Sequence, residues 1–196
     1  YFETFAQDKV LYPFGHGLSY THFSLSGRQT GPLAFEAQVT NTGDRPGRNA
    51  VLLFVEKPCG KLGNPTRELV AFGKTPDLAP GESATLTFSL DPYQLSSFDE
   101  SGITGHRSCY VLQEGTYRFC LGGSVREATA LGEYTVDALT VTKQLTEAAA
   151  PAQTFPILAW EDGEITKRSA AAKTVDLKQR ILKSLPQDRF QTGDRG

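Results

Sequence analysis

The chain has 196 residues, a formal net charge of −2 and 39% hydrophobic residues, which is enough apolar material for a folded core. Its 20 basic residues are scattered, which argues against a nucleic-acid partner, and its longest compact apolar run, 51–55, is too short to span a membrane. Three cysteines are too few for a disulfide framework and no secretory signal is visible, so we expect a reducing, cytoplasmic compartment.

The first distinctive segment is Y-P-F-G-H-G-L-S-Y-T at 12–21. Its proline and two glycines predict a compact loop, which Phe14, Leu18 and Tyr20 are expected to pack onto the rest of the fold. His16 stands between the glycines, where a side chain can approach a ligand closely. A metal needs further ligands and a general base needs a partner, and neither is apparent, so packing is the favoured interpretation.

Short strands separated by turn signals occupy residues 33–142, a pattern typical of an antiparallel sandwich. Apolar and polar residues alternate in 33–40 and more clearly in 82–91, which predicts two half-buried strands. The sequence N-T-G-D at 41–44 supplies the turn that ends the first of them.

Three further elements are predicted in the same region. The run 51–55 is apolar on both faces, as expected for a central strand that is covered on both sides. Asp91 and Pro92 predict the start of one or two helical turns that extend through Leu95. The segment 133–141 is the last candidate strand.

Two strands, 107–112 and 116–121, are expected to form a hairpin around 113–115 and to close the sheet. In that register Cys109 and Cys120 face each other on the outer side, at a separation compatible with a disulfide. A bulge in the turn would break the pairing and a reducing compartment would keep the thiols free, so free thiols are favoured and the disulfide stays open. The same register places four residues on the core-facing side: Tyr110, Leu112, Tyr117 and Phe119.

The C-terminal part has a different character. The segment 147–153 is rich in Ala and Pro and predicts a linker. Residues 174–185 follow an amphipathic helical pattern, with Thr174 as the cap and Pro186 as the stop. A single helix of this length is marginal in water, so it is expected to need another surface on which to bury its apolar face.

No catalytic constellation is found, and no catalytic, cofactor-binding or metal-binding residue is assigned. A hydrolytic carboxylate pair must face a common substrate, but Asp99 and Glu100 are neighbours whose side chains point to opposite sides of an extended chain. We interpret them as part of a solvated loop. Carboxylates in the tail segments receive the same interpretation, and no G-x-S-x-G elbow marks a nucleophile: Glu161, Asp162 and Asp194.

The segment at 12–21 resembles the entry to the fibronectin type III-like domain of glycoside hydrolase family 3, the β-glucosidase and β-xylosidase family. Further motifs of that domain follow in family order, so that the resemblance covers roughly residues 10–125. They are V-T-N-T-G-D-R-P-G at 39–47, G-K-L-G-N-P-T-R-E-L-V-A-F at 60–72, L-A-P-G-E-S at 78–83, L-D-P-Y-Q-L at 90–95 and E-G-T-Y-R-F at 114–119.

The resemblance implies an all-β fold, a fibronectin type III-like (immunoglobulin-like) antiparallel β-sandwich with a short C-terminal helix. Residues 1–20 are expected to connect from an absent α/β domain, 21–145 to form the sandwich, and 146–196 to be a linker plus short helix leading to an absent barrel, as in members with rearranged domain order. The family's nucleophilic aspartate lies in the barrel in a Ser-Asp-Trp context. The only tryptophan here, Trp160, follows Ala159, so no catalytic residue is carried over.

The implied function is that of a non-catalytic accessory domain of a retaining β-glycosidase. Its expected partners are the parent's α/β sandwich and catalytic barrel domains and, through the parent, an oligosaccharide or glycoside substrate; the segment alone is expected to be inactive and to need no cofactor. The alternatives are a stand-alone glycan- or protein-binding module and a fragment without function. Glycan sites expose aromatic platforms, whereas most aromatics here are expected in the core: Phe35, Phe54, Phe88, Tyr117 and Phe119.

Overall fold

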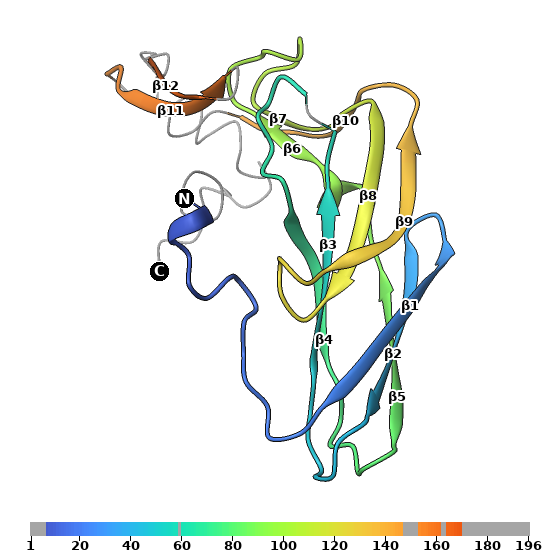
Figure 1. Cartoon of the computed structure of the whole chain (residues 1–196). Helices are drawn as coiled ribbons and strands as arrows, with labels where there is room; N and C mark the ends of the chain where they lie inside the picture. The colour runs from blue at the N-terminus through green and yellow to red at the C-terminus, as the bar shows by residue number, and fades with distance from the viewer. Residues whose placement is uncertain (1–6, 59, 147–152, 162–163, 170–196) are drawn as a thin grey trace, which may run out of the picture.

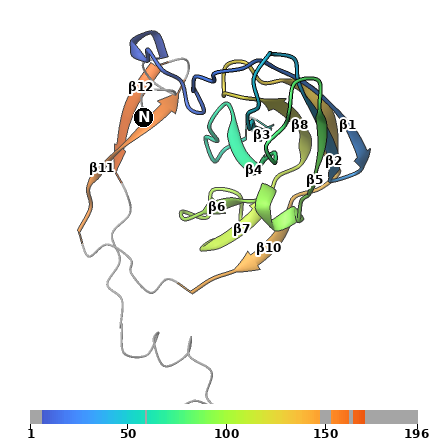
Figure 2. The ribbon, with the colours of Figure 1, turned by 90° about the horizontal axis from the view of Figure 1, so that it is seen from below.

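The computed structural model describes residues 7–58, 60–146, 153–161 and 164–169. Antiparallel strands form an elongated sandwich, which confirms the predicted all-β class (Figure 1). Viewed from below, the strands between residues 23 and 144 surround a common interior (Figure 2). The elements are η1 (Gln7–Lys9), β1 (Phe23–Gly31), β2 (Ala34–Asn41), β3 (Ala50–Glu56), β4 (Glu68–Lys74), β5 (Ser83–Ser89), η2 (Pro92–Leu95), β6 (Ser97–Asp99), β7 (Cys109–Leu112), β8 (Gly115–Gly122), β9 (Thr129–Val136), β10 (Thr140–Gln144), β11 (Pro156–Glu161) and β12 (Glu164–Ser169).

The first sheet has the strand order β1–β2–β5. Along β2, Phe35, Ala37 and Val39 are buried while the residues between them are more exposed, as the alternation at 33–40 predicts. Strand β5 pairs with β2 so that Phe88 lies opposite Phe35, which confirms the half-buried strand predicted at 82–91. Strand β1 was not among the predicted strands and forms the edge of this sheet.

The second sheet has the order β4–β3–β8–β9. Strand β3 is hydrogen-bonded on both sides, and its side chains are covered on both faces, as predicted for the run 51–55. Val51, Leu53 and Val55 belong to the main core. Phe54 points to the other face, where it packs with Cys120 and with other residues of a smaller cluster.

The main core lies between these two sheets. The ring centroids of Phe35 on β2 and Phe119 on β8 are 4.6 Å apart, so aromatic side chains of opposite sheets meet directly. Both rings are almost fully buried, and each contributes roughly 2–3 kcal/mol of hydrophobic stabilisation. This burial fixes the relative position of the two sheets.

A small third sheet, β10–β7–β6, shows that the predicted hairpin of 107–112 and 116–121 is wrong. Strand β7 pairs with β6 and β10, whereas β8 pairs with β3 and β9. The chain therefore passes from one sheet to another between the two strands. Gly115 has φ +127, so the glycine does adopt a positive φ, but it serves this crossing and not a hairpin turn.

The last strand predicted for the sandwich, 133–141, is divided in two. Strand β9 ends at Val136 and pairs with β8, and β10 begins at Thr140 and pairs with β7. The break between them lets the chain leave the four-stranded sheet and join the small sheet. Period-two alternation continues across such a break, so it does not reveal the change of partner.

Polar side-chain contacts stabilise the chain after β5 and after β2. Asp91 caps η2 in a capping box, accepting from the backbone N–H of Tyr93 at 2.7 Å while Gln94 Oε1 accepts from Asp91 N–H at 2.7 Å. This confirms the predicted helix start, although the helix is one turn of 3₁₀ type. The turn after β2 is also confirmed, and the fully buried Asn41 holds it through its side-chain amide, which donates to the carbonyls of Arg45 and Leu78.

The C-terminal part contains a hairpin that the sequence analysis did not expect. Strands β11 and β12 pair from Pro156 opposite Ser169 to Glu161 opposite Glu164. The predicted helix at 174–185 and most of the predicted linker at 147–153 lie outside the described residues. Among the described residues, no helix has the length and hydropathy needed to cross a membrane.

Candidate functional site

The motif at 12–21 is anchored to the second sheet at one point. The Phe14 ring meets the Phe54 ring edge to face, with centroids 6.4 Å apart, and the Phe14 carbonyl accepts from Val125 N–H at 2.9 Å. Gly15 follows with φ +87, and a Cβ there would lie 2.6 Å from a Leu52 methyl carbon. Only glycine fits this contact, because it combines the positive φ with the close approach.

The rest of the motif is not packed, which corrects the expectation for Leu18 and Tyr20. Leu18 is 95% exposed and Tyr20 is 93% exposed. Leu11 and Tyr12 are also largely exposed, so four large side chains within ten residues present most of their surface to solvent. We call Leu11, Tyr12, Leu18 and Tyr20 the N-terminal strip.

His16 is exposed and contacts residues of its own segment. Its backbone N–H donates to the Pro13 carbonyl at 2.9 Å, and its ring lies 5.0 Å from that of Tyr12. Across the described ranges, no group of three or more His, Cys, Asp or Glu side chains could hold a metal ion.

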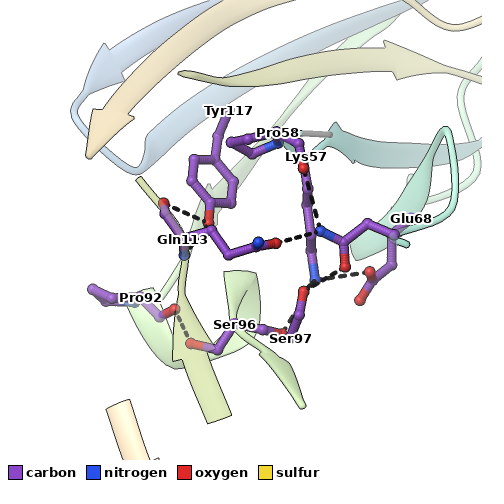
Figure 3. Close-up of polar contacts among 9 residues, drawn as sticks. Lys57, Pro58, Glu68, Pro92, Ser96, Ser97, Gln113 and Tyr117 are labelled. Atoms are coloured by element: carbon purple, nitrogen blue, oxygen red, sulfur yellow. Dashed lines mark hydrogen bonds and ion pairs between the residues drawn. The ribbon is translucent and has the colours of Figure 1, made fainter. Parts of the chain in front are cut away.

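A buried lysine organises the loop between β3 and β4, a feature that the sequence analysis missed (Figure 3). The Lys57 side chain is only 2% exposed, and its Nζ lies 2.8 Å from Glu68 Oε2. The same ammonium donates to the Ser96 carbonyl at 3.2 Å and to Ser97 Oγ at 3.4 Å. A lysine that ends an apolar strand is the sequence signal for such an arrangement, because its charge must find partners when buried.

Further side chains extend this network across the end of the sandwich (Figure 3). Asn64 accepts from Ser97 Oγ at 2.7 Å and donates to Gln113 Oε1 at 2.9 Å. The Gln113 backbone N–H donates to the Tyr117 hydroxyl at 2.9 Å. Burial raises the pKa of Tyr117 to about 12, although the Gln113 hydrogen bond acts in the opposite direction, so the hydroxyl stays neutral.

Arg67 anchors the other end of the loop between β3 and β4. Its Nε lies 2.8 Å from Glu56 Oε1, and its Nη1 donates to the carbonyls of Val125 at 2.6 Å and Ala128 at 3.1 Å. The loop is thereby tied to β3 and to the β8–β9 connection. Both this contact set and the Lys57 network position backbone at this end of the sandwich.

Asp99 is not the solvated residue that the sequence analysis expected, because it is fully buried. Its carboxylate accepts from the backbone N–H of Gly102, Ile103 and Thr104 and from the Thr104 hydroxyl. Burial by itself would raise the pKa of Asp99, but these hydrogen bonds outweigh it and hold the pKa below its ordinary value. Asp99 therefore folds the loop after β6.

The cysteine expectation is corrected in part. Cys109 and Cys120 are free, as favoured, but they lie in different sheets and both are buried, so they are not outward-facing partners. Burial raises the pKa of both thiols, with a smaller contribution from the Asp99 carboxylate at Cys109 and from Glu56 at Cys120. Such thiols are poor nucleophiles at neutral pH.

The outer face of the first sheet carries a hollow with no aromatic side chain in its lining. The residues around it are small or polar: Ser26, Gly27, Arg28, Glu36, Gln38 and Thr85. Arg28 and Glu36 already pair with each other at 2.6 Å. The hollow therefore lacks the apolar surface that binding of a small molecule or a sugar ring would use.

Comparisons with known proteins agree on one type of domain. A family model described as a fibronectin type III-like domain matches residues 49–125. A β-glucosidase of Ruminococcus albus is 39% identical over 199 residues, covering 100% of this chain and 21% of the relative. A Butyrivibrio fibrisolvens β-glucosidase A is 38% identical over 70% of this chain.

Solved structures give the same result. A Paenibacillus barengoltzii β-glucosidase matches 100% of this chain and 23% of its own, with a TM-score of 0.85 and 42% identity. Thermotoga neapolitana β-glucosidase 3B, solved with α-D-glucose, matches 68% of this chain and 18% of its own, with a TM-score of 0.57 and 32% identity. The chain spans about a fifth of the length of these relatives.

Proposed function

This chain belongs to the fibronectin type III-like domains of glycoside hydrolase family 3, and from this premise we propose that it is the non-catalytic accessory domain of a retaining β-glucosidase. The relatives named β-glucosidase are about five times longer than the segment they share with this chain, which supports a parent with further domains. The Ser-Asp-Trp context of the family's nucleophile does not occur in this sequence, which supports assigning the hydrolysis to those further domains.

The N-terminal strip is the observation that carries the proposal. Its four side chains are among the most exposed large hydrophobic residues of the described chain. An apolar surface of this kind marks a contact with another protein surface. In the proposed parent, the strip contacts a larger domain of the same polypeptide, while Phe14 and Gly15 hold it against the second sheet.

The first test is enzymatic and uses the 196-residue chain. The purified chain is expected to release no nitrophenol from aryl β-glucosides, whereas the protein encoded by the uninterrupted reading frame is expected to do so. Hydrolysis by the chain alone that survives removal of host enzymes contradicts the proposal. A reading frame without any further domain also contradicts it.

A second test addresses the strip in the protein encoded by the whole frame. Leu18→Asp together with Tyr20→Asp is expected to lower its melting temperature, because the two charges would enter a domain contact. Thr85→Asp together with Ser89→Asp, at two exposed positions of β5, adds the same number of charges and is the matched control. An equal effect of the control and the strip variant would remove the strip from the proposed contact.

The proposal includes a cytoplasmic, reducing location. The free, buried thiols of Cys109 and Cys120 support it, because neither is engaged in a disulfide. Fractionation of the source cells, followed by detection of the protein with an antibody, tests the location. Recovery of the protein in the extracellular fraction would contradict it.

A further inference from the structure

The small sheet β10–β7–β6 presents a row of three side chains on one face. Phe98 of β6 is the cross-strand partner of Tyr110, and Tyr110 of β7 is the partner of Lys143 of β10. Directly opposite residues of antiparallel strands point to the same face, so the three side chains form a line across the sheet. The neighbours Cys109 and Val111 point to the other face and are fully buried.

Tyr93 of η2 completes an aromatic group around this line. Its ring centroid lies 4.9 Å from that of Tyr110 in an edge-to-face arrangement, and the Phe98 centroid lies 5.3 Å from that of Tyr110. Tyr93 is 39% exposed and Phe98 is 44% exposed. A hydrogen bond with the Tyr93 side chain is the main cause of a raised pKa of Tyr110, so the Tyr110 hydroxyl stays neutral. We call Tyr93, Phe98, Tyr110 and Lys143 the aromatic row.

A β-bulge in β10 places the lysine in the aromatic row. The register steps between Val141 and Lys143, so Lys143 and not Thr142 lies opposite Tyr110. The Lys143 ammonium lies 5.3 Å from the centroid of the Tyr93 ring, within the range of a cation–π contact. Thr142, the extra residue, is held by its own hydroxyl, which donates to the Tyr110 carbonyl at 3.2 Å.

The sheet beneath the row is held by the polar network described above. The Ser96 carbonyl and Ser97 Oγ, at the start of β6, accept from the buried Lys57 ammonium. Asp99, at the end of β6, folds the following loop through four hydrogen bonds. Phe98 therefore projects from a strand whose two ends are both held by hydrogen bonds. This lowers the conformational entropy that its ring would lose on binding a ligand.

The composition of the aromatic row favours a sugar as its ligand over the surface of another protein. A stable protein interface buries about 800 Å² on each side and is poor in lysine at its centre. The row offers three rings, two of which carry hydroxyl groups, and one ammonium. A pyranose needs this mixture, because its C–H groups contact the negative face of an aromatic ring while its hydroxyls need donors and acceptors.

We propose that the aromatic row is a carbohydrate-binding surface, on which Phe98 and Tyr93 contact the C–H face of a sugar ring in a neutral oligosaccharide and the tyrosine hydroxyls and Lys143 contact its hydroxyl groups. The structural part of this proposal stands on the row alone. The proposed parent function suggests a β-linked glucan as the first sugar to test.

Native gel electrophoresis of the 196-residue chain tests the proposal with mixed-linkage β-glucan, xylan and soluble starch in separate gels. At least one of these neutral polysaccharides is expected to slow the wild-type chain. Phe98→Gln is expected to weaken the apparent binding about tenfold, the size of one lost stacking contact. Phe72→Gln, which removes an exposed ring from β4, is the matched control and is expected to bind like the wild type.

A second measurement requires no substitution and decides the matter if Phe98→Gln does not fold. On addition of an oligosaccharide, the ring proton resonances of Phe98 and Tyr93 in the wild-type chain are expected to shift, and those of Phe72 are not. Binding of xylan or starch but not of β-glucan would support the aromatic row as a carbohydrate-binding surface and would count against a β-glucan as its ligand. The enzymatic test of the proposed parent function is independent of this result.

Three results overturn the proposal. The first is that none of the three polysaccharides slows the wild-type chain or shifts the ring resonances. The second is that a folded Phe98→Gln variant binds as well as the wild type. The third is a concentration-dependent dimer that Phe98→Gln abolishes, which would assign the aromatic row to a contact between two copies of the chain.

Discussion

The N-terminal strip and the aromatic row both expose large apolar side chains, but they are supported in different ways. The strip belongs to an irregular segment that contacts the second sheet at Phe14 and Gly15. The row projects from paired strands, above fully buried side chains and beside a network of charged and polar groups. The strip also contains two leucines, whereas the row contains only aromatic rings and a lysine.

This difference teaches that exposure alone does not define a function. A segment that is held at one place can adapt its shape to a large partner. Its aliphatic side chains contribute to binding only through the burial of their apolar surface. Rings on fixed strands keep their spacing before a ligand arrives, as selective stacking requires. The following predictions perturb one region while leaving the other in place.

The largest effect is expected from Glu68→Ala, which weakens the support of the aromatic row. It removes the anionic partner of Lys57 and leaves the buried ammonium with only neutral acceptors. We expect a loss of about 3 kcal/mol in the free energy of unfolding, measured in urea. Arg118→Ala breaks the exposed pair with Glu133 and is expected to cost less than about 1 kcal/mol. Equal losses in the two variants would show that Lys57 does not depend on Glu68.

Asp99→Asn is expected to cost about 2 kcal/mol, because an amide cannot accept all the hydrogen bonds that converge on the carboxylate. The pKa of Asp99 in the folded chain lies below its unfolded value of about 3.9. The carboxylate therefore stabilises the fold above that value, and this contribution is lost as the pH falls through the folded pKa.

Unfolding of wild type and Asp99→Asn at a series of pH values from about 6 to about 2 measures this contribution, because the window follows from the depressed pKa. The difference between the two proteins is expected to shrink at the acid end. A difference that is the same at every pH would contradict the assignment of Asp99 as an ionised acceptor.

Gly15→Ala perturbs the N-terminal strip and leaves the row intact. The substitution places a Cβ 2.6 Å from a Leu52 methyl carbon at a positive φ, which costs about 1–2 kcal/mol for the backbone alone. We expect the segment to detach and to be cut faster by a protease. Gly17→Ala is the control, because a Cβ there has open space, and it should be cut at the wild-type rate. Equal cleavage of both variants would refute the anchor.

The smallest effect is expected from Leu18→Asp in the chain by itself. The side chain is 95% exposed, so the free energy of unfolding should change by less than about 0.5 kcal/mol. Denaturation of this variant beside Leu53→Asp, which places a charge in the core, sets the scale. A large loss for Leu18→Asp would mean that Leu18 is already packed within the chain.

Local patterns predicted many elements of this fold, because they depend on which face of a strand is buried. The alternation around Phe88, the apolar run around Leu53 and the Asp91 cap each correspond to a structural element at the predicted place. The same patterns did not find the aromatic row. The prediction that Tyr110 faces the core is wrong, because Tyr110 is only partly buried while its neighbours Cys109 and Val111 on the opposite face are fully buried. The pairing of β7 with β6 and β10, which the local pattern does not contain, decides this orientation.

The sequence by itself determined the all-β class, the faces of the principal strands and the kinship with a family of domains, because short-range periodicity and ordered motifs carry that information. Tertiary structure decided which strands are partners. Strand β7 joins β6 and β10 instead of β8, which separates Cys109 from Cys120 and brings Phe98, Tyr110 and Lys143 into line. Such pairings depend on contacts between distant segments, and the alternation of residues along one strand does not indicate which strand pairs with it.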